Sequence, residues 1–340
     1  MTVIYHEEDG DLGLLSGKTV AVIGYGHMGQ AMAHNLRDSG VQMIVADPRP
    51  ERQAQIIDAG LVPATLDEAT RSAEILLLLL RDELMPRIYL EQISPHLRRD
   101  QMLLFSNAYN VTFGFIEAPP FVDVGLVAAR TYAAAVRSRY LSGEGFASFV
   151  AVAQDASRQA WQTVLAVARA IGALKGGAVE IGFEQETELD LFMQQAILPV
   201  FHQLIITAAQ LLMARGYPPE AVFTELYLSN ETSDYLRQAG KNGLMEALKL
   251  QSLTSQYGVL SRYERFADLK LERLMEITME EIRSGRFAEE WAKEYAADYP
   301  RLQALRKLRE GLDMWELEQQ TLELLHRDDA PDGNAGSDDT

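Results

Sequence analysis

Short apolar runs alternate with amphipathic segments through the first half of the chain. Six of these runs are apolar along nearly their whole length, as strands buried on both faces of a sheet are. They are Thr19–Ile23, Gln42–Ala46, Glu74–Leu80, Met102–Phe105, Asp123–Ala128 and Ser148–Ala153. Segments with helical periodicity, such as Gln30–Asp38 and Pro50–Ala59, separate the early ones. The alternation predicts an α/β domain with a doubly wound parallel sheet that helices cover on both faces.

The pattern changes after Gly182. A long helical run extends from Glu184 to Arg215, with a break or kink near Pro199, and helical periodicity continues to about Leu325. We therefore predict a sheet domain over residues 1–182 and an all-helical domain over residues 183–326. Residues 327–340 contain no apolar anchor and are expected to form a disordered acidic tail.

Composition limits the function more than the fold. The chain has 340 residues and a formal net charge of −18, from 49 Asp and Glu against 31 Lys and Arg. This excess of acid argues against a nucleic-acid partner, because phosphate binding needs clustered Lys and Arg. The absence of cysteine excludes disulfides, thiolate metal sites and a cysteine nucleophile.

Nothing in the sequence predicts export or membrane insertion. The first residues, MTVIYHEEDGDLGLL, are acidic and lack the basic and apolar regions of a signal peptide. The longest apolar run, Ile75–Leu80, is far shorter than the roughly 20 residues that a membrane-spanning helix needs. We expect a soluble cytoplasmic protein with no membrane partner.

A glycine-rich sequence directly follows the first strand and opens the first helix. It has the spacing GxGxxG, which in this position is typical of a dinucleotide-binding Rossmann domain. The first glycine permits a tight turn, the second lets the backbone approach the pyrophosphate, and the third lets the helix pack on the strand. The helix N-terminus then offers amide donors to the phosphates. We assign cofactor contacts to Gly24, Tyr25, Gly26, His27, Met28 and Gly29.

The end of the second strand bears on the choice of nucleotide. Asp47 stands 23 positions after Gly24, where a carboxylate accepts hydrogen bonds from the ribose hydroxyls of NAD. Arg49 and Arg52 follow, and either could hold the 2′-phosphate of NADP instead. Because a carboxylate at the strand end repels a phosphate, the sequence favours NAD(H) over NADP(H).

Segments along nearly the whole chain resemble one enzyme family. They are IYHEEDGDLGLLSGKTVAVIGYG, Asp82-Glu83, FSNAYNVTFG, QDASRQA, ETELDLFMQQA, GYPPEAVFTE, QYG and FAEEW. In this order they resemble the short-form ketol-acid reductoisomerases. The resemblance implies a Rossmann domain, a knotted helical domain, and a homodimer whose active sites combine helices from both subunits. It also implies a cofactor contact at Asp82, two magnesium ions, and a metal-driven alkyl migration coupled to hydride reduction in branched-chain amino-acid biosynthesis.

The positions that the resemblance assigns to metal depart from the family pattern. A family Asp–Glu pair, four residues apart, becomes Asp190 and Gln194, and a second pair, of two glutamates, becomes Glu225 and Ser229. Asp190 and Glu225 stay candidate metal ligands, whereas Gln194 and Ser229 become candidate substrate contacts. With two of four carboxylates missing, tight binding of two Mg²⁺ ions is not expected.

Other chemistry-bearing positions also differ. Asn107 stands where the family has a histidine, and the family's PKGPGH sequence aligns with residues 129–134. Arg130 keeps the positive charge of the family lysine, and Tyr132 adds bulk and a hydroxyl group. Ser252 aligns, across a short insertion, with the serine that contacts the substrate carboxylate.

These differences predict a reductase that retains hydride transfer and lacks the isomerase step. Hydride transfer needs a bound nicotinamide, an oriented C=O or C=N group and a proton donor, but no metal. A small keto- or imino-acid-like substrate is expected. Tyr132 and Tyr109 are candidate proton donors and Arg130 a candidate carboxylate clamp. Asp190 or Glu225 would steady an iminium or amine.

Three alternatives stay open. The chain could be a working ketol-acid reductoisomerase with an unusual site. It also resembles β-hydroxyacid dehydrogenases and imine reductases in its glycine loop, although Glu184–Arg215 lacks the lysine that those dehydrogenases use. Finally, it could be a non-catalytic nucleotide-binding interaction protein, a reading that the reshaped segment around Arg130 and Tyr132 disfavours.

Overall fold

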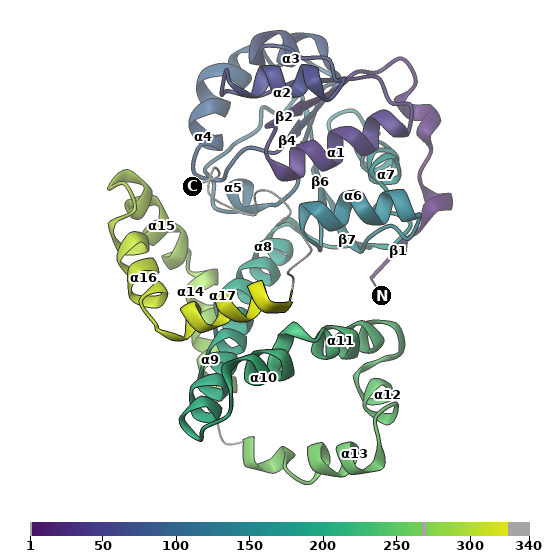
Figure 1. Ribbon diagram of the computed structural model, residues 1–340. Helices are drawn as coiled ribbons and strands as arrows, with labels where there is room; N and C mark the ends of the chain where they lie inside the picture. Colours follow the sequence, from purple (N-terminus) through teal and green to yellow (C-terminus); the bar gives the residue numbers. More distant parts are fainter. Residues whose placement is uncertain (1, 267–269, 326–340) are drawn as a thin grey trace. The chain divides into compact units, whose positions relative to one another are not determined.

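The structure is a computed structural model that describes residues 2–266 and 270–325 (Figure 1). The chain forms two compact units, of which the first is Met1–Asp190 and the second begins at Leu191. The boundary that we predict near residue 182 falls between the last strand and the last helix of the first unit. The predicted tail, residues 327–340, lies outside the described residues.

One eight-stranded sheet organises the first unit, in the order β1-β8-β7-β6-β5-β4-β2-β3. The strands are β1 (Ile4–Tyr5), β2 (Val20–Ile23), β3 (Met43–Ala46), β4 (Ile75–Leu78), β5 (Met102–Phe105), β6 (Asp123–Ala129), β7 (Ser148–Gln154) and β8 (Ala178–Glu180). The five strands from β3 to β6 are all parallel. They coincide with five of the six predicted runs, so the Rossmann-type prediction is confirmed.

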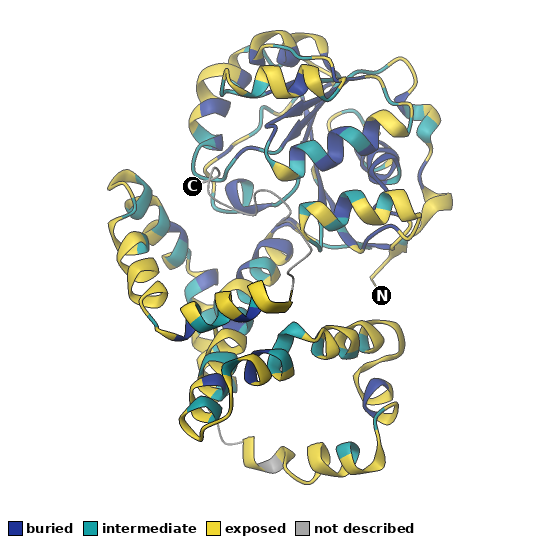
Figure 2. Cartoon of the chain, viewed as in Figure 1, coloured by how far each residue is buried: buried dark blue, intermediate teal, exposed yellow. Residues whose placement is uncertain are grey.

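Helices pack on both faces of this sheet because alternate strand residues point to opposite sides. Val20 and Val22 of β2 join a core cluster that includes residues of α1 (His27–Asp38), α2 (Arg52–Asp58), α6 (Ala133–Ser142) and α7 (Ala160–Ile171). Ala21 and Ile23 join a second cluster with α3 (Leu66–Ser72) and α4 (Met85–Ile88). Accordingly β2, β4 and β5 are buried along their whole length, and β3 and β6 nearly so (Figure 2).

The sheet is mixed, and in this respect the prediction of a parallel sheet is wrong at one edge. β7 runs antiparallel to β6, with Ala129 opposite Ser148, and β1 runs antiparallel to β8. After β6 the chain forms α6, turns at Gly143, whose φ is 77°, and re-enters the sheet beside the end of β6. An apolar run buried on both faces has the same pattern in either direction, so its sequence does not specify the orientation.

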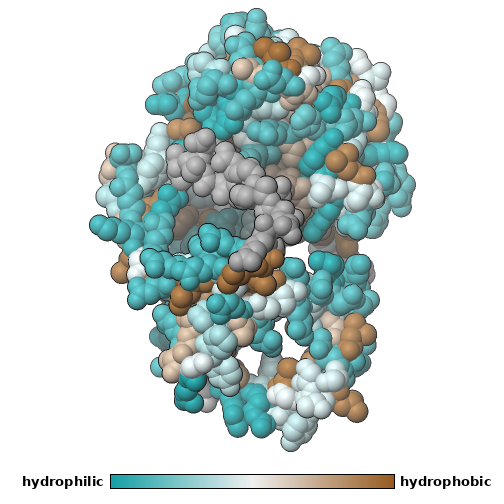
Figure 3. All heavy atoms as spheres, viewed as in Figure 1, coloured by the Kyte–Doolittle hydropathy of each residue, from teal (hydrophilic) through white to brown (hydrophobic). Residues whose placement is uncertain are grey.

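The second unit is helical, as predicted. Its helices are α9 (Leu198–Ala214), α10 (Pro219–Phe223), α11 (Glu231–Asn242), α12 (Leu244–Lys249), α13 (Leu253–Leu260), α14 (Leu271–Arg283), α15 (Arg286–Ala296), α16 (Pro300–Glu310) and α17 (Met314–Leu325). Much of their surface is exposed (Figure 2), and hydrophobic side chains appear among the helices on the face shown in Figure 3. A small core forms around Ala209, Val222, Phe223 and Met314.

Two π-helical turns interrupt the helices, and they contain Gln194 and Glu225, two of the four positions that the family resemblance assigns to metal. η5 (Met193–Ile197) lies between α8 (Phe183–Phe192) and α9, and η6 (Thr224–Leu228) follows α10. Pro199 stands in the first turn of α9, directly after η5, so the break predicted near this residue is a π turn. The helical stretch Phe183–Ala214 is long and apolar enough to cross a membrane by length and composition alone. The sequence did not predict such a helix, because polar residues interrupt its apolar positions.

Candidate active site

The glycine loop leads from β2 into α1 at the carboxyl edge of the sheet. Gly24 has a φ of 106°, and a Cβ there would lie 2.5 Å from the carbonyl oxygen of Leu79. A Cβ on Gly29 would overlap the carbonyl oxygen of Gly24. Both positions therefore require glycine, the first for its turn and the second for close packing of α1 on the loop, as the sequence predicts.

The N-terminus of α1 is suited to a pyrophosphate. Gly26 is the N-cap, and it has no side chain that could cap the first turn of the helix. His27 is exposed, whereas Met28 packs against the hydrophobic core. The first-turn amides of a helix and the positive end of its dipole attract an anionic group. These residues fit the dinucleotide that the spacing predicts.

Asp47 directly follows β3 and faces the glycine loop. Its Oδ2 accepts a hydrogen bond from the Tyr25 N–H at 2.6 Å. Its Oδ1 accepts bonds from the backbone N–H of Arg49 at 2.9 Å and from Nε of Arg49 at 3.0 Å. The carboxylate is only 2% exposed. Arg52 bonds instead with Gln55 on its own helix, at 2.7 Å from Nη1 to Oε1.

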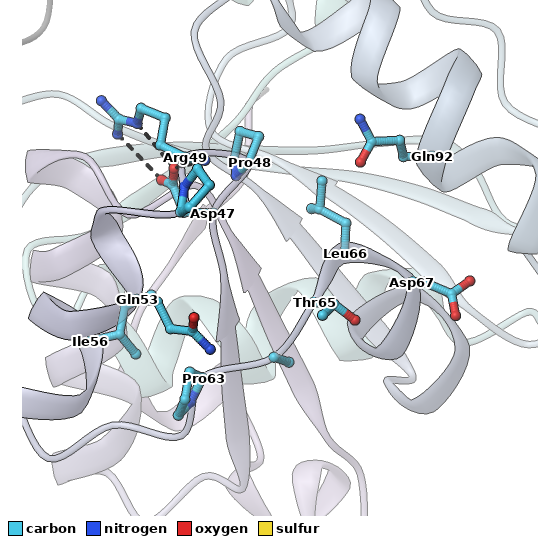
Figure 4. Close-up of a pocket in the computed structure, with 12 residues that line it drawn as sticks. Asp47, Pro48, Arg49, Gln53, Ile56, Pro63, Thr65, Leu66, Asp67 and Gln92 are labelled. Carbon is cyan, nitrogen blue, oxygen red and sulfur yellow. Dashed lines mark hydrogen bonds and ion pairs between the residues drawn. The ribbon is translucent and has the colours of Figure 1, made fainter.

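A pocket of ≈ 360 Å³ opens beside this carboxylate (Figure 4). It is lined by Asp47 and Arg49 from the end of β3, by Thr65 and Leu66 at the start of α3, and by Gln92. The pocket lies at the carboxyl end of a parallel strand, where open α/β sheets bind ligands.

Asp82, after β4, and Asn107, after β5, meet at the same edge of the sheet. Nδ2 of Asn107 donates to Oδ1 of Asp82 at 3.0 Å, and Nδ2 of Asn110 donates to the backbone carbonyl of Asp82 at 3.1 Å. Tyr109 is buried, and its hydroxyl and Oδ1 of Asn110 have no hydrogen-bond partner among the described residues. Buried unpaired polar atoms are costly, so this cluster is suited to an additional polar partner.

Arg130 follows β6 and connects the sheet edge to α8. Its Nη1 donates to Oδ1 of Asp190 at 2.9 Å, and its Nη2 donates to Oε1 of Glu186 at 3.2 Å. The guanidinium lies over the ring of Phe149, with Cζ 5.1 Å from the centroid. Glu186 is fully buried, and its Oε2 accepts a hydrogen bond from the Ala108 N–H at 2.9 Å. These contacts fix Arg130 between two carboxylates.

The electrostatics of this edge are typical of a reactive site. Burial raises the pKa of Asp82 to about 6, against the hydrogen bond from Asn107 and with help from the charge of Glu83. Burial also raises the pKa of Glu186 to about 7, although the Ala108 N–H and Arg130 oppose the shift. Carboxyl groups with pKa values near neutrality gather at functional sites more often than elsewhere.

The two candidate proton donors have opposite surroundings. Tyr132 is 83% exposed and forms the N-cap residue of α6. Tyr109 is buried, and both its burial and the charges of Asp82 and Glu83 raise the pKa of its hydroxyl above the usual value. Both stay predicted donors.

The candidate residues of the second unit are exposed. Gln194 lies in η5 and Glu225 in η6, and Ser229 ends that turn. Oγ of Ser252 accepts a hydrogen bond from the Ser255 N–H at 3.1 Å, so Ser252 caps α13. Glu225 and Ser255 line one pocket of ≈ 400 Å³.

Comparison with known proteins identifies the family. The profile described as "Acetohydroxy acid isomeroreductase, NADPH-binding domain" matches residues 14–177, and that described as "Ketol-acid reductoisomerase, C-terminal domain" matches residues 183–326. The chain belongs to the ketol-acid reductoisomerase family.

Named relatives cover the chain almost completely. The ketol-acid reductoisomerase (NADP(+)) of Methanothermobacter thermautotrophicus is 37% identical over 317 residues, 92% of this chain and 96% of the relative. That of Methanocaldococcus jannaschii is 37% identical over 91% of this chain and 93% of its own. The structure of an NADH-preferring ketol-acid reductoisomerase from an uncultured archaeon has a TM-score of 0.89 and 30% identity, and the match covers 95% of this chain and 99% of that one.

The residues of this family member do not fit two divalent ions. Gln194 and Ser229 supply no charge, and Asp190 forms an ion pair with Arg130. Mg²⁺ is bound in proteins through one or two carboxylates per ion, and the two carboxylates left at these positions, one of them paired with Arg130, are too few for a pair of ions.

Two functional neighbours of Arg130 were not among the predicted site residues. Glu186 precedes Asp190 by four residues on α8, a spacing that places both on one helix face. The spacing suggests Glu186 as a substitute metal ligand, but it does not predict the ion pair of Glu186 with Arg130. Phe149 comes from β7, and no sequence signal connects it to Arg130, because the contact depends on the antiparallel β6–β7 pairing.

Proposed function

We propose that this member of the ketol-acid reductoisomerase family is a nicotinamide-dependent reductase without the metal-driven alkyl migration. It would reduce the C=O or C=N group of a small keto- or imino-acid-like substrate. The ion pair between Arg130 and Asp190, 2.9 Å long, is the observation that carries the proposal. Because of this ion pair, the positive charge of Arg130 lies beside Asp190, a carboxylate that the family resemblance assigns to metal.

The two halves of the family reaction make different demands. Alkyl migration needs divalent cations that polarise a carbonyl and an adjacent alkoxide together. A bound nicotinamide supplies hydride without a metal. The glycine loop that would bind it is complete, whereas Gln194 and Ser229 replace two carboxylates. An intact glycine loop together with an altered set of metal-binding positions supports loss of the migration with retention of reduction.

The working ketol-acid reductoisomerase, acting in branched-chain amino-acid biosynthesis, is the second candidate. The comparisons favour it over the first, because relatives 37% identical over more than nine-tenths of the chain carry that name. Under this reading Asp190 and Glu225 would serve as metal ligands, and Arg130 would have to release Asp190.

We propose NADH as the preferred cofactor. The buried Asp47 carboxylate, at the end of β3, supports this choice. The family profile and the archaeal relatives are described with NADPH or NADP(+), and the solved neighbour is described as NADH-preferring. For NADPH, Arg49 would have to leave Asp47 to meet the 2′-phosphate.

Residues of the chain itself would orient the substrate and supply the proton. Tyr132 or Tyr109 would donate the proton as a hydrogen-bonded acid, and Asp82 with Asn107 would position the cofactor at the end of β4. Asp190 and Glu225 are candidates for steadying an iminium or amine, and Gln194, Ser229 and Ser252 for contacting the substrate.

We also propose a cytoplasmic homodimer with shared active sites. Apolar side chains of α9 support it: Phe201 is 41%, Leu204 61% and Leu211 56% exposed. Exposed apolar side chains on one helix are more typical of an interface than of a free surface. Light scattering on the purified protein should give twice the chain mass.

Turnover with matched substrates tests the function. NADH and NADPH oxidation is followed with 2-oxo acids, cyclic imines and 2-acetolactate, each with Mg²⁺ and again with a chelator. We expect reduction of an oxo acid or imine at a rate that the chelator leaves unchanged. Conversion of 2-acetolactate that requires Mg²⁺ would establish the second candidate and exclude the first. Nucleotide binding with no turnover in any arm would exclude both.

A further inference from the structure

A permanent cation lies beside the carboxylate of α8 that the family resemblance assigns to metal. The guanidinium of Arg130 bonds Asp190 through Nη1 and Glu186 through Nη2. Arginine stays protonated under all ordinary conditions and matches carboxylates with its planar fork. A divalent ion on Asp190 would therefore lie within a few ångströms of a like charge.

The surroundings keep this cation in place. Glu186 is fully buried, and within the described part of the chain the Ala108 N–H is its other hydrogen-bond donor besides Arg130. Breaking a buried ion pair by removing one partner is strongly unfavourable, because a buried charge is left uncompensated. The Phe149 ring supports the guanidinium from one side. Displacement of Arg130 by a metal ion would thus cost more than the loss of one surface ion pair.

We propose that Arg130 is the resident cation of this site and takes the place of a divalent metal ion. Glu186 and Asp190 hold its guanidinium, which excludes metal from Asp190. Each terminal nitrogen of a guanidinium carries two N–H groups, and Glu186 and Asp190 engage one on each. Nε of Arg130 donates to the backbone carbonyl of Ala129 at 3.3 Å. The second N–H group of each terminal nitrogen binds an oxygen of the substrate, a role that rests on the proposed reductase function.

The charge and shape of a guanidinium explain which half of the family reaction it can serve. Its N–H groups can orient and polarise one substrate oxygen through charge-assisted hydrogen bonds. It cannot expand its coordination to hold two neighbouring oxygens, as a pair of metal ions does in alkyl migration. Arg130 is accordingly a specificity-determining residue.

Metal binding can be measured without turnover, by Mn²⁺ titration followed by electron paramagnetic resonance and calorimetry on the NADH-loaded protein. We expect no saturable binding up to about 10 mM Mn²⁺ for the native chain, given its missing carboxylates. Saturable binding within this range would overturn the proposal.

Two variants isolate the contribution of Arg130. The double variant Gln194→Glu/Ser229→Glu restores the missing carboxylates, and a triple variant adds Arg130→Lys. We expect the triple variant to bind Mn²⁺ at least about tenfold more tightly than the double variant, because lysine is a flexible point charge without the guanidinium fork. Equal affinities would overturn the proposal.

A control variant and a fold measurement complete the test. Arg137→Lys, added to the double variant, changes a distant arginine that pairs with Asp38, and it should leave Mn²⁺ affinity unchanged. Circular dichroism verifies that each variant folds. If the carboxylate variants do not fold, the single variant Arg130→Lys is compared with the native chain, and Mn²⁺ binding that is no tighter in this variant would overturn the proposal. Because these readouts involve no substrate, inactivity in the reductase assay would refute the proposed function and leave the metal result standing.

Discussion

Oδ2 of Asp47 accepts a hydrogen bond from the Tyr25 N–H, with 2.6 Å between the two atoms. The bond connects the end of β3 to the glycine loop after β2. The same carboxylate holds Arg49 through Oδ1. A single side chain thus supports the loop that would carry the pyrophosphate and restrains the cation that would recognise a 2′-phosphate.

Replacing this carboxylate should alter nucleotide preference. Asp47→Asn keeps an acceptor for the Tyr25 amide but removes the charge that holds Arg49. We expect the ratio of kcat/KM for NADPH to that for NADH to rise at least about tenfold, or about 1.4 kcal/mol of relative transition-state binding. Steady-state kinetics with both nucleotides measure it. In the double variant Asp47→Asn/Arg49→Ala this gain should disappear; a gain that persists would rule out Arg49 as its source.

The close packing of α1 on the loop should not tolerate a methyl group. A Cβ on Gly29 overlaps the carbonyl oxygen of Gly24, so Gly29→Ala should lower the free energy of unfolding by about 2–4 kcal/mol and weaken nucleotide binding. Gly240 in α11 is the matched control, because a Cβ there meets no atom within 4 Å. Gly240→Ala should raise stability by about 0.5–1 kcal/mol. Denaturant unfolding of both variants measures these changes in the free energy of unfolding. Equal stability of Gly29→Ala and the native chain would contradict the packing argument.

The two candidate proton donors, Tyr109 and Tyr132, can be distinguished by measuring both the rate of reduction and the free energy of unfolding of their phenylalanine variants. Tyr109→Phe deletes a buried hydroxyl that lacks a partner among the described residues, so the apo protein should be equally or more stable. Tyr132→Phe changes an exposed side chain and should shift stability by less than about 0.5 kcal/mol. Whichever tyrosine donates the proton, its phenylalanine variant should slow reduction at least about tenfold. Unchanged rates in both variants would exclude both donors.

The raised pKa of Asp82 predicts a pH dependence of stability. Burial raises this pKa from 3.8 to about 6 in the folded protein. Between these values the folded state binds more protons than the unfolded state, so the contribution of Asp82 to stability grows as pH falls from about 6 to about 4. Across this window the native chain should gain up to about 3 kcal/mol relative to Asp82→Asn, which cannot titrate.

Urea unfolding of both proteins at several pH values measures this difference. The difference should be constant above about pH 7, where Asp82 is ionised in both states. A difference that stays constant from pH 4 to pH 7 would show that Asp82 is not buried as described.

Local sequence was sufficient for the elements that carry the cofactor site. Gly24 and Gly29 meet backbone atoms that are close along the chain or in the neighbouring strand, and the spacing alone predicts both glycines. The strands of the parallel part were predicted because burial on both faces makes them apolar. The fold and the nucleotide loop therefore follow from short-range patterns.

The contacts of Arg130 could not be predicted from short-range sequence patterns. Arg130, Glu186 and Ala108 are separated by up to 78 positions, and whether Arg130 meets a substrate or a protein carboxylate depends on how α8 packs against the strand ends. A family alignment predicted a positive charge at residue 130 and a carboxylate at residue 190, but not that the two neutralise each other.

The sequence by itself determined the class of fold, the dinucleotide loop and the two absent carboxylates at Gln194 and Ser229, because each of these is a matter of residue identity or local spacing. Only the tertiary structure decided that Arg130 is held by Glu186 and Asp190, that Asp47 supports the glycine loop, and that β7 runs antiparallel to β6. Electrostatic energies depend on distance and burial, and both are set by contacts between segments that lie far apart along the chain.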